Sequence, residues 1–127
     1  MPSEFTYGWS YRKQIVVGSS AVSGTLTNFP MLVSWPSDSN LVPPNVQMNG
    51  NDILFTDSNG NKLNHEIEQY TSSNGGLVAW VQIPLLTSGT VIYMYYGNTT
   101  VGSQQNAQAT WNGNYAAVSF FKCELHT

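Results

Sequence analysis

Apolar and polar residues alternate through most of this chain, and Gly, Pro, Asn or Asp interrupts the alternation roughly every 8–12 residues. A period of two places successive side chains on opposite faces, as in a β-strand with one buried face. The pattern predicts strands over residues 11–17, 28–35, 52–56, 62–70, 77–83, 90–96 and 115–121. No amphipathic helix of convincing length is expected. We therefore expect an all-β fold, an antiparallel two-sheet β-sandwich of jelly-roll-like form with about seven strands.

Turn residues refine this prediction. Pro30 cannot donate to a strand ladder, so it places 28–35 at a sheet edge or at the start of its strand. Pro84 is expected to end 77–83. Asn59-Gly60 suits the positive φ of a hairpin turn, which makes 62–70 the returning strand. The segments 36–50 and 101–114 are irregular, with a helical turn possible in the first and a loop or weak helix in the second.

The 127 residues are expected to form one domain, a single module over residues 9–121. Residues 1–8 are interpreted as an N-terminal extension or added residues, and 122–127 as an atypical tail with the lone Cys123. Because the ends differ in composition from the rest, we expect an excerpt from a longer chain. A single cysteine excludes an internal disulfide.

Composition limits the possible partners. Only 9% of the residues are charged while 13% are aromatic, against about a quarter charged in an average soluble domain. Four basic residues and a net charge of −3 cannot supply the cationic surface that nucleic acid requires. No apolar run approaches the roughly 20 residues of a membrane span. A surface of neutral polar groups and aromatic rings suits a neutral, hydroxyl-rich ligand.

Several segments occur in an order typical of one microbial family. They are residues 9–15 (WSYRKQI), 24–33 (GTLTNFPMLV), 50–57 (GNDILFTD), 65–68 (HEIE), 79–84 (AWVQIP) and 92–98 (IYMYYGN). The chain resembles the family of domain of unknown function 2341 from residue 9 to about residue 121. The resemblance implies a β-rich module of a large exported microbial protein, at the cell surface or outside the cell. Such modules often precede a concanavalin-like, laminin-G-type jelly roll, and residues 111–118 (WNGNYAAV) resemble the bridge into it. The family resemblance implies no catalytic residues.

Aromatic side chains are the main candidate ligand-binding groups, because an indole or phenol ring can stack on the apolar face of a sugar while its polar end stays hydrated. The candidates are Trp35, Trp80, Tyr70, Tyr93 and Tyr95, together with Trp9 before the first strand. Tyr93 and Tyr95 are two residues apart on one strand, so they share a face at a spacing of roughly 7 Å. The alternative is that these rings belong to the core.

Glu66 and Glu68 form a second candidate. Their backbones are about 7 Å apart on one strand face, and glycoside hydrolases use carboxyl pairs roughly 5–9.5 Å apart. A further carboxylate found in some jelly-roll glycosidases is missing here, because Gln69, Tyr70 and Thr71 follow. The simpler interpretation is a solvated strand face, with Lys62 or Arg12 across the strands.

Metal binding receives less support. Asp52, Asp57, Asn59 and Asn61 offer the oxygen ligands that calcium prefers. Counted from Asp57, Gly60 is at position four, whereas an EF-hand loop has its glycine at position six. A hairpin turn is therefore the simpler interpretation, and a structural calcium site is the alternative. His65, His126 and Cys123 do not have the spacing of a metal site. We therefore expect no cofactor.

Three functions follow from the sequence, in this order. The first is a non-catalytic carbohydrate-binding module for neutral polysaccharide. The second is a structural or adhesion module that packs against a neighbouring jelly-roll domain. The third is a glycoside hydrolase that uses Glu66 and Glu68.

Overall fold

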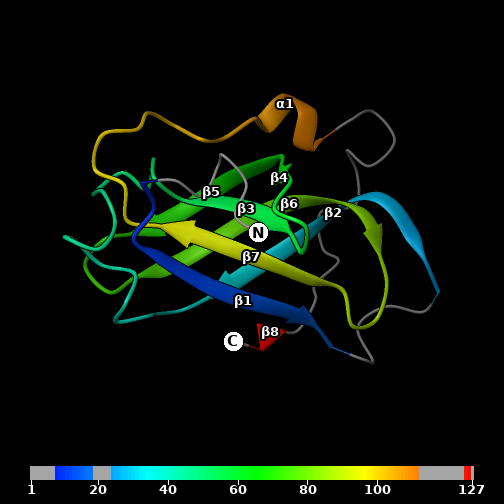
Figure 1. The fold of residues 1–127 in the computed structure, drawn as a ribbon. Coiled ribbons are helices and arrows are strands. Elements are labelled where there is room, and N and C mark those ends of the chain that lie inside the picture. The colour runs from blue at the N-terminus through cyan, green and yellow to red at the C-terminus, as the bar shows by residue number, and fades with distance from the viewer. Residues whose placement is uncertain (1–7, 19–23, 112–124, 127) are drawn as a thin grey trace.

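A computed structural model describes residues 8–18, 24–111 and 125–126. The elements are β1 (Tyr11–Val17), β2 (Leu26–Trp35), β3 (Leu54–Asp57), β4 (Lys62–Leu63), β5 (His65–Thr71), β6 (Gly76–Leu86), β7 (Val91–Tyr96), α1 (Ala107–Thr110) and β8 (Leu125–His126) (Figure 1). The predicted strand 115–121 lies outside the described residues, as does most of the N-terminal extension.

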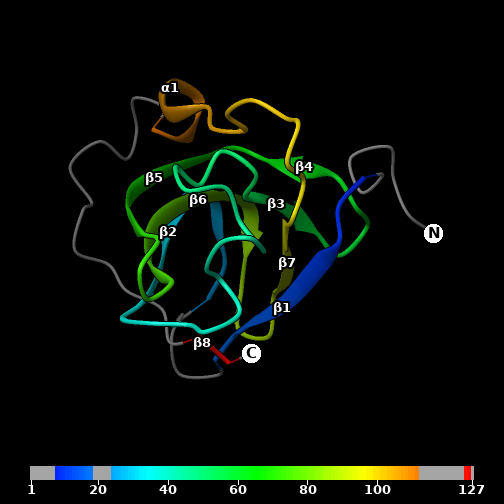
Figure 2. The same ribbon diagram turned by 90° about the vertical axis from the view of Figure 1, so that its left-hand side faces the viewer.

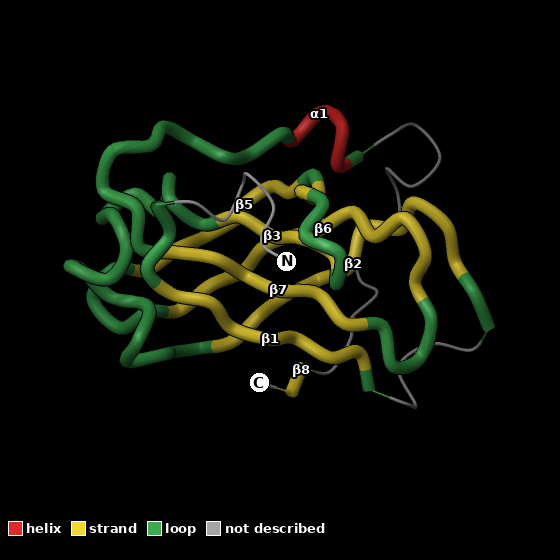
Figure 3. The backbone as a smooth tube through the Cα atoms, viewed as in Figure 1, coloured by secondary structure: helices red, strands yellow, loops and turns green. Residues whose placement is uncertain are grey.

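The strands form two antiparallel sheets, in the orders β4-β3-β7-β1-β8 and β2-β6-β5. The end view in Figure 2 shows them on opposite sides of one interior, and Figure 3 shows loops joining them at both ends. The short helix α1 lies outside this interior, beside β5 (Figure 2). The expected β-sandwich is confirmed.

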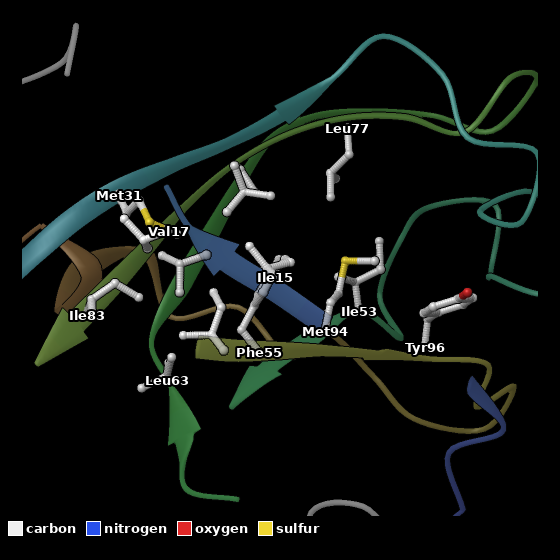
Figure 4. Packing of buried hydrophobic residues seen from close by; sticks show 14 of the residues in the cluster. Ile15, Val17, Met31, Ile53, Phe55, Leu63, Leu77, Ile83, Met94 and Tyr96 are labelled. Atoms are coloured by element: carbon white, nitrogen blue, oxygen red, sulfur yellow. The ribbon is translucent and has the colours of Figure 1, made fainter. Parts of the chain in front are cut away.

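The core fills the space between the sheets, as the alternation of side chains requires. On β1, Ile15 and Val17 are buried while Arg12 and Gln14 are exposed, which matches the two predicted faces. On β7, Ile92, Met94 and Tyr96 are the buried set. The second sheet contributes Phe29, Met31 and Val33 of β2 and Leu77, Ala79, Val81 and Ile83 of β6 to the same cluster. Met31, Leu77 and Ile83 are among the side chains labelled in Figure 4.

The prediction of one continuous strand over residues 62–70 is wrong, because the chain passes from one sheet to the other at Asn64. Leu63 on β4 pairs with Phe55 of the first sheet, whereas His65 on β5 pairs with Val81 of the second. Asn64 fixes this corner through bonds with Gln82 of β6. The Gln82 amide N–H donates to the Asn64 carbonyl at 2.9 Å, and the Asn64 side-chain amide donates to Gln82 Oε1 at 3.2 Å.

The prediction that Pro84 ends its strand is also wrong, since β6 continues to Leu86. Pro84 lies between Ile83 and Leu85, which pair with Phe29 and Thr27 of β2. The ladder therefore resumes after one position that lacks an amide donor. Pro30 behaves as predicted, because β2 is an edge strand of its sheet.

Candidate functional site

The candidate site is a hollow of about 660 Å³ on the outer face of the β2-β6-β5 sheet. We call it the β5–β6 hollow. Its lining residues are Leu32, Glu66, Ile67, Glu68, Val78, Trp80 and Trp111. The neighbours of these residues along the strands, including Met31, His65, Ala79 and Val81, face the core instead. The hollow thus collects outward side chains of three strands, together with Ile67, which also packs against the core, and Trp111 from beyond α1.

Strand register brings the lining together. Glu66 stands opposite Trp80, and Trp80 stands opposite Leu32, so the three side chains form one row across the sheet. An irregularity between Ile67 and Gln69 leaves Glu68 without a direct partner on β6. Such a bulge turns a side chain away from strict alternation, and Glu68 lies within reach of the Trp80 indole.

Both carboxylates of the hollow are held by indole N–H groups. Trp80 Nε1 donates to Glu68 Oε1 at 2.9 Å, and Trp111 Nε1 donates to Glu66 Oε1 at 2.6 Å. The two indole rings are 5.0 Å apart at their centroids, with 59° between their planes. Hydrogen bonds to an ionised acceptor are stronger than those between neutral groups. The two rings and the two acids therefore brace one another.

Trp111 reaches the hollow because the preceding segment is fastened along β5. We call residues 102–111 the strap. The Asn106 amide donates to the His65 carbonyl at 2.9 Å, and Gln105 Oε1 accepts from the Ile67 amide at 2.7 Å. Asn106 also caps α1, accepting from the Ala109 amide at 3.1 Å. These bonds occupy backbone groups of the edge strand β5 and set the chain direction into Trp111.

The structure divides the predicted ligand-binding residues among three places. Trp80 lies in the hollow, but only 5% of its surface is exposed, so it serves as a wall with little free ring face. The sequence placed Trp111 in a bridge to another domain and not in a site, although this half-buried residue lines the hollow. The Glu66/Glu68 pair was the sequence signal for this place.

Trp35 and Tyr70 pack against the core cluster from its margin. The Trp35 indole N–H donates to the Gly75 carbonyl at 3.2 Å, and the Tyr70 hydroxyl donates to the Leu41 carbonyl at 2.7 Å. Burial, with a smaller contribution from the Asp52 carboxylate, raises the pKa of Tyr70 to about 12. Tyr70 is therefore a structural residue here.

Tyr93 and Tyr95 share the outer face of the other sheet, as their spacing predicted, and both are half-buried. The Arg12 guanidinium carbon lies 4.4 Å from the centroid of the Tyr93 ring. This cation–π contact occupies one face of that ring. Because β7 belongs to the other sheet, Tyr93 and Tyr95 lie on the opposite side of the sandwich from the β5–β6 hollow.

The expectation that Lys62 or Arg12 lies across the strands from Glu66 and Glu68 is wrong. The Lys62 ammonium donates to Gln104 Oε1 at 3.1 Å, and Arg12 belongs to the opposite sheet. The Lys13 ammonium forms its ion pair with Asp38 Oδ2, at 3.1 Å, and not with either glutamate. Among the residues that the structure describes, the side-chain partners of Glu66 and Glu68 are indole N–H groups and not cations.

The aspartates proposed for calcium hold backbone amides. Asp52 is buried and accepts from the amides of Gln47 and Asn98, both at 2.9 Å, which ties two loops together. Asp57 Oδ1 accepts from the Asn59 and Asn61 amides, as in the predicted turn. Within the described residues, no three His, Cys, Asp or Glu side chains converge on a possible metal position.

His65 is fully buried in the core, and neither ring nitrogen has a hydrogen-bond partner among the described residues. Its ring meets Phe55 edge-on, with centroids 5.1 Å apart. Burial, helped by the charge of Lys62, lowers the pKa of His65 to about 4. The imidazole is therefore neutral near pH 7, and His65 is a core residue of β5.

Comparison with known proteins identifies the family. Neither the curated proteins nor the solved structures contain a match. α1 has four residues, and the described part of the chain contains no helix long and apolar enough to cross a membrane. The family described as Domain of unknown function (DUF2341) matches residues 49–122, which is more than half of the chain and includes β3 to β7, the strap and both glutamates. The chain therefore belongs to the DUF2341 family.

Proposed function

We propose that this β-sandwich is a non-catalytic carbohydrate-binding module and that neutral polysaccharide binds in the β5–β6 hollow. The observation that carries the proposal is the open hollow in which two indoles brace two carboxylates. Leu32, Val78 and Trp111 offer apolar surface to sugar C–H groups. Each carboxylate has lone pairs beyond the one used by an indole, so it can accept hydroxyl hydrogens.

The setting of this module is part of the same proposal. A binding domain of this size would hold a larger exported microbial protein on a glycan, outside the cell or at its surface. Neighbouring domains of that protein would be its other partners. The scarcity of charge in the chain supports a neutral ligand rather than nucleic acid or a membrane surface.

Affinity electrophoresis tests the proposal, with cellulose derivatives, xylan, chitin derivatives and β-glucans in the gel. The protein should be retarded by at least one of them. Trp111→Ala removes a ring and the Glu66 bond at the margin of the hollow and should abolish retardation. Tyr93→Ala is the matched control, because it removes a half-buried ring from the opposite sheet and should leave retardation unchanged. Unretarded migration on every polysaccharide would refute the proposal.

A structural or adhesion module is the second candidate. Leu32, Val78 and Trp111 give the hollow apolar surface, which a neighbouring domain could cover as well as a sugar. This alternative predicts concentration-dependent self-association of the isolated chain by light scattering. A monomer at all concentrations, together with polysaccharide binding, would decide against it.

A glycoside hydrolase is the third candidate, favoured by the location of Glu66 and Glu68 in one hollow. Glu66→Gln and Glu68→Gln keep the shape of each side chain while removing its acid function. Release of reducing sugar that disappears in either variant would establish the enzyme. Binding that persists in the wild type without any product release would leave the non-catalytic function.

A further inference from the structure

A second, smaller hollow lies beside the first, towards Trp35 of β2 and Leu77 of β6. Its volume is about 130 Å³, and Trp35, Gln69, Thr71 and Val78 are among its lining residues. Val78 lines both hollows. The two therefore adjoin at one side chain of β6, and we call them together the groove.

The groove follows the strand direction. The first hollow is centred on the row of Trp80, whereas the second reaches Leu77, which pairs with Trp35 of β2 and Tyr70 of β5. Three residues along a strand advance about 10 Å. That length exceeds one sugar ring, so a glycan that reaches both hollows must place linked rings end to end.

The walls of the groove differ in polarity. On β5, Glu66, Glu68, Gln69 and Thr71 supply hydrogen-bonding groups along its length. On the β2–β6 side, Leu32, Val78 and the edge of Trp35 are apolar. A pyranose chain has the matching arrangement, with hydroxyl groups at the ring edges and C–H groups on the ring faces.

Charge selects among such chains. Among the described residues, no lysine, arginine or histidine lines either hollow, and both ionisable lining groups are carboxylates. The carboxylates of Glu66 and Glu68 would repel a glycan that bears carboxylates or sulfates, and such a glycan would find no cationic partner there among the described residues. The occupant that fits is therefore uncharged.

We propose that the groove binds an internal segment of a linear, neutral glycan, with successive rings in the Trp80/Trp111 hollow and in the Trp35/Gln69/Thr71 hollow. This inference rests on the proposed function, and it adds chain binding with a second subsite. Gln69 is exposed on β5, so its replacement should not disturb the fold.

Calorimetry with disaccharides and hexasaccharides of the cello-, xylo-, chito- and laminari- series tests the second subsite. For the series that binds, the hexasaccharide should bind about tenfold more tightly than the disaccharide. Gln69→Ala and Thr71→Ala should weaken hexasaccharide binding several-fold without changing disaccharide binding. Gln14→Ala, an exposed glutamine on the opposite sheet, is the matched control and should change neither.

Two failures remain distinguishable. If both lengths bind equally and Gln69→Ala and Thr71→Ala have no effect, the second subsite is wrong while the binding function stands. If no series binds at either length, both proposals are overturned. A tenfold preference for length that survives both substitutions would also overturn this subsite, because the gain would then arise elsewhere.

Discussion

His65 is a neutral imidazole sealed between the sheets, and that makes stability depend on pH. Its pKa is about 4 in the folded protein against 6.5 in the unfolded chain. Between these values the unfolded state binds the proton and the folded state does not. The free energy of unfolding should therefore fall as pH drops from 6.5 to 4, by about 3 kcal/mol from this residue.

Replacement of the imidazole isolates its contribution from that of the carboxylates. His65→Phe keeps an aromatic ring beside Phe55 and removes the titrating group. Urea unfolding at several pH values should give a shallower loss of stability for the variant than for the wild type. Parallel curves for the two proteins would show that His65 is not the cause.

Gly75 is a position where a methyl group has no space. A Cβ there would lie 1.9 Å from the Asp38 carbonyl oxygen, and the residue has a φ of +78°. Gly75→Ala should cost at least about 2 kcal/mol in unfolding free energy. Gly89→Ala is the control, since Gly89 has a φ of +83° and no atom within 4 Å of the same Cβ. Equal losses in the two variants would mean that φ alone, without the clash, sets the cost.

The strap is the element that joins the fold to the hollow. Gln105 accepts from the Ile67 amide on the outer edge of β5. Gln105→Ala should expose that amide and speed its hydrogen exchange roughly fivefold, in line with one net hydrogen bond. Gln108→Ala, which removes an exposed glutamine from α1, should leave the Ile67 rate unchanged. An Ile67 rate that is the same in both variants and the wild type would contradict this role of the strap.

Elements with a plain alternating pattern were predictable, and elements fixed by tertiary pairing were not. β1 has its predicted bounds because Ile15 and Val17 alternate into the core while Arg12 and Gln14 are exposed. The break at Asn64 had no turn signal, since the chain stays extended and only its pairing partner changes from β3 to β6. The prediction that Pro84 ends its strand was wrong for a related reason. Ile83 and Leu85, on either side of Pro84, both pair with β2, so tertiary pairing continues the strand past the proline.

The candidate site shows the same division. Glu66, Glu68 and Trp80 were identified from the sequence, but as separate candidates, because only strand register brings Glu66 opposite Trp80. Trp111 is far along the chain and depends on the strap, which has no strong periodicity. Tyr93 and Tyr95 were correctly placed on one face, but the sequence could not tell which sheet carries them.

At the scale of the whole molecule, the scarcity of charge predicts how binding responds to salt. A neutral ligand held by hydrogen bonds and ring contacts gains little from long-range charge, so screening should have little effect. Affinity for the polysaccharide that binds should change by less than about twofold between low and high sodium chloride. A steep loss of affinity with salt would indicate an anionic or cationic ligand instead.

Indole NMR tests the central claim most directly, because the four tryptophans (Trp9, Trp35, Trp80 and Trp111) give four Nε1–H signals. We predict that the cello-, xylo-, chito- or laminari-hexasaccharide that binds will shift the Trp80 and Trp111 signals, while Trp9 stays in place. Their N–H groups contact Glu68 and Glu66, so a sugar in the hollow must alter their surroundings. If none of the four hexasaccharides moves either signal, or if binding shifts Trp9 alone, the β5–β6 hollow is not a carbohydrate site.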